Sequence, residues 1–516
     1  MAKNHESAAD AASRPEDLTG IPHPGCLPAW EVGEMPAPVA FQWNWKTFIA
    51  LVGPGIVMIG GTIGTGEWVT GAGVAALYRG ALLWVAPLAI LSQVILNTEV
   101  MRYTLVTGEP AFTGFLRCRP GPRFWLIGYL MLDCMSWWPA LAGLASQILL
   151  FLVLGKDPLP EQIRWTSCGL LILCGTLLCF GGKIYNTLEV VLSGKVIFVL
   201  LYLTFCTVVF VPGQVWSEIV VGMVNPFNIP PDIQWGLIGA VAGLAGIGGM
   251  GNILASNFVR EKGWGMGATV GAIGSAVGGQ EIKLSHLGTI ARPTEEACRR
   301  FDRWWSHVKR DQFGLWFGGS IVGMLLPCLM GAAFLKDNYF QAKGKEAVAS
   351  VALAQDFGAA ITAQFGSTQG QIMTLLTLLC GFVILFPGQF SALDGVARRW
   401  CDAFWSGSRR VRAMDAGKVR YLYYGFVGAY VTIGCCLNAL GMSAPKMMVI
   451  NANLANLAIT GCILQTLYVN THFLPEAFRP TKAKQVAMVL AAVFYASIFS
   501  LVTKQTIEKA IAGTLF

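Results

Sequence analysis

The chain has 516 residues, of which 54% are hydrophobic and 13% are charged, and its formal net charge is +8. With a mean hydropathy of +0.56, this composition excludes a disordered chain and an ordinary soluble domain. The positive charge falls in predicted loops on one side of a membrane, so it does not indicate a nucleic-acid partner. The composition therefore predicts an integral membrane protein in a lipid bilayer.

Residues 1–45 are polar and lack the charged start and apolar run of a cleavable signal peptide, so we expect a disordered cytoplasmic tail. Residues 46–516 are interpreted as one transmembrane domain. A membrane helix needs roughly 20 apolar residues. This rule predicts eleven spans, at about 47–77, 81–106, 123–154, 166–182, 189–212, 233–260, 313–335, 370–396, 419–440, 446–474 and 484–504.

Loop charges predict the orientation. With a cytoplasmic N-terminus, the outer loop 213–232 has no Lys or Arg, and basic residues gather in the inner loops. These are Arg117, Arg119, Arg123, Arg260, Lys262, Arg292, Arg299, Arg300, Arg303, Lys309, Arg310, Arg398, Arg399, Arg409, Arg410, Arg412, Lys418, Arg420, Arg479, Lys482 and Lys484. An odd number of spans places the C-terminus outside, and we expect a multi-pass protein of the cell membrane.

The first span is predicted to be a broken helix. Its sequence from 53 to 73 is GPGIVMIGGTIGTGEWVTGAG, and each glycine costs about 1 kcal/mol in a helix interior. Unwound backbone at membrane depth is tolerated where it is buried in protein or lines a wet cavity, which is typical of transporter sites. Glu67 is the one acid in this break. Either it helps to bind a substrate, or it is protonated or caps the second half-helix and binds nothing.

The sixth span carries a second break, at Gly243, Gly246, Gly248, Gly249 and Gly251. It comes five spans after the first, so the second unit runs in the opposite direction. Paired breaks in two halves indicate an inverted repeat with a site between them. We expect repeat one at about 47–212, repeat two at about 233–474, and an extra helix at about 484–504.

The residue types in the two breaks predict a metal site. Backbone carbonyls near Gly64 and Gly249, together with the Glu67 carboxylate, are hard oxygen donors that suit Mg²⁺, Ca²⁺ or Mn²⁺. The thioether of Met250 would favour softer metals, although packing explains it equally well. The candidate ligands are Glu67, Gly64, Thr65, Gly249, Met250, Asn252 and Asn257. The metal would be a substrate, and no cofactor is expected.

Several segments resemble one family. Gly53-Pro54-Gly55 and GTGEW at 64–68 are similar to the start of Nramp (natural resistance-associated macrophage protein) divalent-metal transporters. LNTEVMRYTLVTGEP at 96–110, PGQFSALDG at 387–395 and the tenth span resemble later family motifs. The resemblance implies an all-α membrane protein of LeuT type, with a 5+5 inverted repeat, broken helices 1 and 6, and an eleventh helix.

The sequence departs from the family at the metal site. The family's Asp-Pro-Gly-Asn is here Gly64-Thr65-Gly66-Glu67, so one carboxylate is kept three residues further on. The family's Met-Pro-His is either Met250-Gly251-Asn252 or Gly249-Met250-Gly251, and in both registers the His is missing. Some members of the family lack these ligands and carry Mg²⁺, so the resemblance implies that this protein transports partly hydrated Mg²⁺. Histidine is the usual group that titrates near neutral pH, so its absence argues against coupling of transport to protons.

Polar residues in other spans are candidate pathway groups. Asp133 is either an ion relay or an interhelical hydrogen-bonding group. Asn453 and Asn456 share a helix face, for which interhelical hydrogen bonding is the default explanation. Gln389 and Asp394 lie where they would line an inner exit.

These observations lead to three functional hypotheses. The first is a secondary-active or facilitated transporter of a divalent cation, with Mg²⁺ or Mn²⁺ favoured. The second is a LeuT-type transporter of a small organic substrate such as an amino acid, bound at half-helix N-termini. The third is a metal-sensing membrane protein without transport. Enzymatic activity is not expected, because the sequence contains no Ser/His/Asp set, phosphate loop or HExxH motif.

Overall fold

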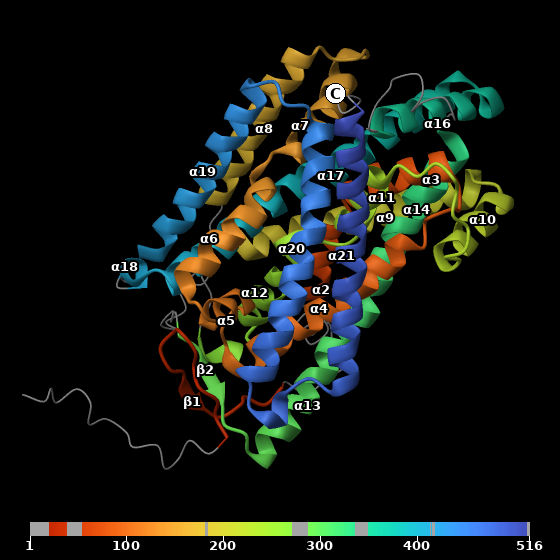
Figure 1. The fold of residues 1–516 in the computed structure, drawn as a ribbon. Coiled ribbons are helices and arrows are strands. Elements are labelled where there is room, and N and C mark those ends of the chain that lie inside the picture. The colour runs from red at the N-terminus through yellow and green to blue at the C-terminus, as the bar shows by residue number, and fades with distance from the viewer. Residues whose placement is uncertain are drawn as a thin grey trace, which may run out of the picture.

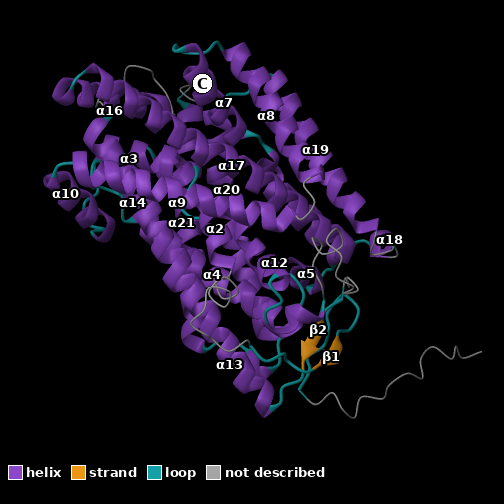
Figure 2. Cartoon of the chain, turned by 180° about the vertical axis from the view of Figure 1, so that it is seen from behind, coloured by secondary structure: helices purple, strands orange, loops and turns teal. Residues whose placement is uncertain are grey.

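A computed structural model describes residues 20–38, 54–180, 184–270, 287–335, 349–412, 414 and 418–512. Long helices pack side by side into one bundle, with a two-stranded sheet at one end and α16 at the other (Figure 1). Seen from behind, helix dominates the described chain and the two strands are confined to one corner (Figure 2). The predicted class, an all-α membrane protein, is confirmed.

The first half of the bundle contains two interrupted spans. Its elements are α2 (Pro54–Thr62), η1 (Thr65–Gly71), α3 (Ala72–Tyr78), α4 (Val85–Thr107), α5 (Ala111–Arg117), α6 (Pro122–Asp133), η2 (Cys134–Trp137), α7 (Ala140–Leu154), α8 (Pro160–Phe180), α9 (Ile184–Phe210) and α10 (Gly213–Val224). The first span is broken between α2 and η1, and the third between α6 and α7.

The second half has one further interruption, between α11 and α12. Its elements are α11 (Trp235–Leu244), η3 (Gly249–Ile253), α12 (Leu254–Glu261), η4 (Gly265–Thr269), α13 (Glu295–Lys309), η6 (Arg310–Phe317), α14 (Gly318–Phe334), α16 (Ala349–Phe365), α17 (Ser367–Gly407), α18 (Arg409–Arg412), α19 (Val419–Ala439), α20 (Ala444–His472), η8 (Glu476–Phe478) and α21 (Lys482–Ile511).

All eleven predicted spans coincide with helices, although residues 47–53 of the first and 181–182 of the fourth lie outside the described ones. Among the described residues, nine helices are long and apolar enough to cross a membrane. Helix α4 is not among the nine, since polar residues such as Gln93, Asn97 and Glu99 lower its mean hydropathy. The repeat boundaries stay a prediction.

Part of the predicted disordered tail is ordered. Strand β1 (Glu31–Gly33) pairs in parallel with β2 (Thr289–Ala291), and the flanking Trp30 is buried. Buried Arg117 donates from Nη1 to the carbonyls of Pro24 and Pro28, both at 2.8 Å. Its guanidinium also lies 4.0 Å from the ring centroid of Trp30. The prediction of disorder is therefore wrong for residues 20–38.

Helix α17 continues beyond the span predicted for it. The span was expected to end near residue 396 and to be followed by a basic loop, but the helix ends at Gly407. Arg398 and Arg399 are thus helical and buried, with 2% and 3% exposure. Their expected place in a solvated loop is wrong, because each pairs with an acid on a neighbouring helix.

Candidate functional site

The first broken helix unwinds at glycine. Helix α2 ends at Thr62, and the π-helix η1 begins at Thr65. Between them, Gly64 has φ −155° and ψ −129°, and its N–H donates to Oε2 of Glu67 at 3.2 Å. Glu67 therefore caps the second half-helix.

The second broken helix also unwinds at glycine. Helix α11 ends at Leu244, and the 3₁₀ helix η3 starts at Gly249. Gly246, Gly248 and Gly249 have φ values of +91°, +73° and +52°. Only glycine adopts such angles without strain, so the glycines of the sequence decide where this helix breaks. Both predicted breaks are present.

The two breaks touch each other through backbone and one side chain. A Cβ added to Gly66 would lie 2.1 Å from the carbonyl oxygen of Leu244, so only glycine permits this approach. Glu67, which is fully buried, also accepts a hydrogen bond from the N–H of Gly246 through Oε1 at 3.1 Å. The single acid of the first break thus bridges both unwound segments.

Gln93 on α4 supports the second break, and sequence reasoning missed it. Its Oε1 accepts hydrogen bonds from the N–H groups of Ile247 and Gly248, both at 3.2 Å. Its Nε2 donates to the carbonyl of Ala245 and, at 2.9 Å, to the hydroxyl of Tyr495. An amide inside a predicted membrane span was the available signal, because such groups are costly and usually functional.

Lys195 on α9 supports the first break, and it was also missed. Its buried Nζ donates to the carbonyl of Gly60, in the last turn of α2, at 2.8 Å. A cation is favourable at this end of a helix, where carbonyl groups lack partners. Lys195 and Glu67 also attract each other electrostatically. The lysine could have been noticed as one of two charged residues in the predicted span 189–212, the other being Glu189 at its start.

A cavity of about 170 Å³ lies between the breaks. Its walls combine the glycines of the unwound backbone with large apolar side chains such as Trp138, Phe258 and Met448. Among the described residues that line it, Arg399 is the one charged residue. The lining glycines are Gly61, Gly64, Gly246, Gly248, Gly249, Gly251, Gly388 and Gly395, and the lining polar side chains are Ser136, Ser391, Tyr430 and Asn451. Along α17 the lining runs from Gly388 to Arg399, which is about 16 Å of helix.

A third interruption contributes to this cavity. Helix α6 ends at Asp133, and α7 begins only at Ala140, after the 3₁₀ turn η2. Ser136 and Trp138 from this interruption line the cavity. The sequence signal was Pro139, because proline cannot donate its hydrogen bond in a helix and restricts the residue before it.

The candidate ligands do not all meet at the cavity. Gly64 and Gly249 line it, and Thr65 begins η1. Met250 and Asn252 are buried away from the lining, and Asn252 donates to the carbonyl of Gly249 at 3.3 Å. Asn257 binds Asp402 on α17 instead.

The asparagines of α20 and Gln389 join helices. Asn453 donates to the carbonyl of Gly236 at 3.2 Å, and Asn456 to that of Gly239 at 2.9 Å, so both hold α20 against α11. Gln389 on α17 accepts from the N–H of Ala142 at 3.0 Å and donates to Tyr430 at 2.9 Å. None of these three side chains lines the cavity.

Asp133 and Asp394 are partners of arginines. Asp133 Oδ2 accepts from Nη2 of Arg399 and from Nε1 of Trp400, both at 2.7 Å. Asp394 lies 2.7 Å from Nε of Arg398 and accepts from Tyr423 at 2.6 Å. Removing one partner of a buried pair is strongly destabilising.

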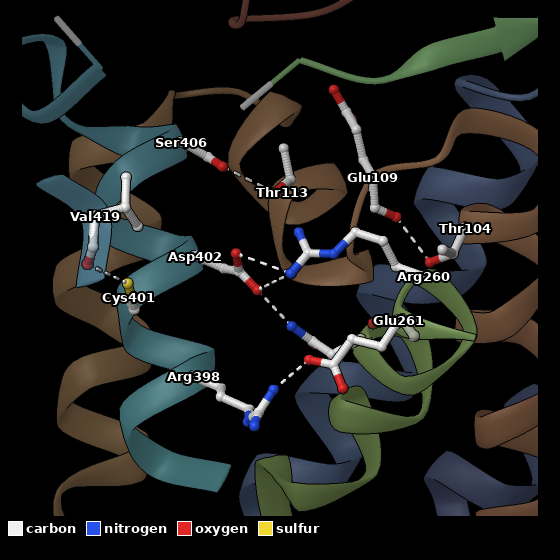
Figure 3. A network of polar contacts seen from close by, with 12 residues as sticks. Thr104, Glu109, Thr113, Arg260, Glu261, Arg398, Cys401, Asp402, Ser406 and Val419 are labelled. Atoms are coloured by element: carbon white, nitrogen blue, oxygen red, sulfur yellow. Dashed lines mark hydrogen bonds and ion pairs between the residues drawn. The ribbon is translucent and has the colours of Figure 1, made fainter. Parts of the chain in front are cut away.

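The same end of α17 is bound to α12 by two more ion pairs (Figure 3). Arg260 Nη2 lies 2.9 Å from Oδ2 of Asp402, and Glu261 binds Arg398. Arg260 was expected in an inner loop, but it is helical and 4% exposed. These contacts join α12 to α17 within one turn of Arg399.

No group of three or more His, Cys, Asp or Glu side chains that could hold a metal occurs in the described ranges. The polar side chains along the cavity include the hydroxyls of Ser136, Ser391 and Tyr430, the amide of Asn451, and the guanidinium of Arg399, which pairs with Asp133.

No family model and no curated protein matches the sequence. Solved structures do match the fold. The manganese transporter of Eremococcus coleocola, in complex with an aromatic bis-isothiourea compound, is 14% identical with a TM-score of 0.63, over 92% of this chain and 91% of that chain. Two variants of that transporter, also 14% identical, cover 93% of this chain and 91% of theirs, with TM-scores of 0.62 and 0.63. The chain therefore has the fold of this membrane transporter.

Proposed function

We propose that this protein is a multi-pass membrane transporter that carries a divalent metal cation, Mg²⁺ or Mn²⁺, by alternating access. The observation that supports it most is the meeting of two unwound segments at one cavity, bridged by a single buried acid. The shared fold with a manganese transporter is consistent with this substrate class.

The cavity suits a hydrated ion better than a bare one. Its volume of about 170 Å³ exceeds many times the roughly 10–15 Å³ that one water needs. Mg²⁺ sheds water reluctantly and usually keeps several water ligands. Glycine carbonyls and the hydroxyls of Ser136 and Ser391 can accept hydrogen bonds from such a shell.

The attraction for a cation comes from Glu67, which does not line the cavity itself but binds two residues that do. Its carboxylate binds the N–H groups of Gly64 and Gly246, and both of these residues line the cavity. Lys195 offsets part of this charge from the other side of the first break. A weakened attraction fits transport, because an ion that is to be released must not be bound too tightly.

For an ion to enter or leave the cavity at the end of the bundle that carries the N-terminal segment, the ion pairs between α12 and α17 would have to separate. With the N-terminus in the cytoplasm and the C-terminus outside, this is the cytoplasmic side of the cell membrane. Interactions between helix halves that can be made and broken are the usual elements of alternating access.

The test is metal uptake into proteoliposomes that contain a dye for Mg²⁺ or Mn²⁺ and, separately, a pH dye. Glu67→Ala should abolish uptake, and Glu218→Ala, which removes an exposed acid paired with Arg79, should leave it unchanged. Mg²⁺ flux without acidification would support an uncoupled carrier. Absence of flux for both metals in well-folded wild-type protein would overturn the proposal, and competition by amino acids would then favour an organic substrate.

A further inference from the structure

A second cavity, of about 970 Å³, lies at the end of the bundle that carries the sheet. It is formed where the start of α6 faces the end of α17 and helix α18, beside the ordered N-terminal segment. Among its lining residues are Arg123, Arg409, Arg410 and Arg412, together with Phe124, Ile127 and Leu130. We call it the arginine groove. It does not share a lining residue with the cavity between the breaks.

Within the part of the chain that the structure describes, the charges of the arginine groove have no acidic partners. None of its four arginines forms an ion pair with an acid among the described residues, and Asp415, which follows α18, lies outside them. Nε of Arg412 is buried without a hydrogen-bond partner in the described chain. Burial, together with the nearby charges of Arg409 and Arg117, lowers the pKa of Arg412. Arginine forks of this kind match phosphate oxygens.

An apolar helix face continues from the arginines. Phe124, Ile127, Leu130 and Met131 are 56%, 59%, 39% and 69% exposed. Their spacing of three and four residues places them on one side of α6. From Phe124 to Met131 this side extends about 10 Å, away from the arginines at the helix start. In a bilayer, this face would lie against acyl chains.

The start of α6 adds to the attraction for an anion. Helix α6 has twelve residues and begins at Pro122, which faces the groove. The N-terminal end of a helix carries partial positive charge and unpaired N–H groups. Trp125, whose Nε1 donates to the carbonyl of Arg119 at 3.2 Å, has the amphipathic character of residues at a membrane surface.

We propose that the arginine groove binds the phosphate headgroup of an anionic phospholipid, with an acyl chain along the exposed face of α6. A free phosphate would satisfy the arginines but leave this face uncovered. The lipid accounts for both features, because its charge and its chain are joined in one molecule. The arginines come from two predicted cytoplasmic loops, and the cytoplasmic leaflet is the anionic one. The site is independent of the transport function proposed above.

The test is native mass spectrometry of the full-length protein with added dioleoylphosphatidylglycerol. The triple variant Arg409→Gln, Arg410→Gln, Arg412→Gln should lose roughly 100-fold in affinity, since each of three basic residues near a membrane surface contributes about 1 kcal/mol. The matched control is Arg303→Gln, Lys309→Gln, Arg310→Gln, which removes the same charge from the exposed part of α13 and its end. It should bind like the wild type. Equal losses of lipid affinity in the two variants would overturn the proposed site, because they would show that the lipid responds only to the overall positive charge of the protein.

Two further arms separate the possible sources of the phosphate. Dioleoylphosphatidylcholine, with the same chains and no net charge, should bind at least tenfold more weakly than the anionic lipid. Inorganic phosphate should compete only weakly, and Ile127→Asn should weaken binding of the lipid. If inorganic phosphate competes as well as the lipid and Ile127→Asn has no effect, the ligand is a soluble phosphate and the lipid proposal is wrong.

Discussion

The two broken helices look alike in sequence but are held open in different ways. The first has one local partner, Glu67, three residues from Gly64, and one distant partner, Lys195 on α9, 135 residues from Gly60. The second depends on side chains more than 150 residues away, namely Glu67 and Gln93. Glycine makes unwinding cheap in both. The difference shows that buried N–H and C=O groups freed by unwinding still need partners, which another helix can supply.

Glu67→Ala should reduce metal uptake most strongly, since it removes the hydrogen-bond acceptor that both breaks share. Bonds to charged groups contribute about 1.5–3 kcal/mol each, so two lost bonds predict uptake reduced by about 100-fold or more. Hydrogen–deuterium exchange should rise in peptides from both 57–70 and 243–253. A rise in only one of these peptides would show that Glu67 does not bridge the breaks.

Gly66→Ala should come next, because the added methyl would collide with the backbone of Leu244. Such overpacking costs about 1–3 kcal/mol and should reduce uptake by about tenfold. Gly169→Ala is a matched control, since nothing lies within 4 Å of its added Cβ. Wild-type uptake by Gly66→Ala, at equal expression, would contradict the close contact of the two breaks.

Gln93→Ala should affect the second break alone. It leaves the N–H groups of Ile247 and Gly248 without their acceptor, at a cost of about 1–3 kcal/mol. Exchange should rise in 243–253 and stay unchanged in 57–70, with uptake reduced several-fold. Gln93→Glu keeps the acceptor and should recover part of the protection. Equal hydrogen exchange in the wild type and Gln93→Ala would show that Gln93 does not stabilise the second break.

Lys195→Met should have the smallest effect and should act on the first break alone. It frees the carbonyl of Gly60, the residue before Gly61, which lines the cavity. A loss of about 1 kcal/mol predicts a moderate rise of exchange in 57–70. Because a positive charge is also removed, the apparent affinity for Mg²⁺ should increase. A decrease in this affinity would mean that Lys195 itself helps to bind the substrate.

Much of the fold was predictable, because apolar runs and glycines act locally. The helix ranges and both breaks follow from hydropathy and from glycine's conformational freedom. The third break at Pro139 could have been predicted from the same kind of signal. The order in residues 20–38 could not, since it depends on Arg117 meeting Trp30 and the carbonyls of Pro24 and Pro28.

The candidate site was predictable only in part. Gly64 and Gly249 line the cavity, and Glu67 bridges the breaks. Asp133 and Asp394 are acids in predicted spans. The sequence alone indicates that such residues are important, but it does not say what each of them binds. Their partners are Arg399 and Arg398, which hydropathy had assigned to a loop.

By itself, the sequence determined that this chain is a helical membrane protein whose first and sixth spans unwind. Those properties depend on residues close together along the chain, namely apolar stretches and glycine clusters. Only the tertiary structure decided which partner each buried polar group takes. Gln93, Lys195 and Arg399 reach the cavity region from helices far away in sequence. The physical reason is that burying a charge or an amide is costly unless a partner is found, and helix packing determines which partners are within reach.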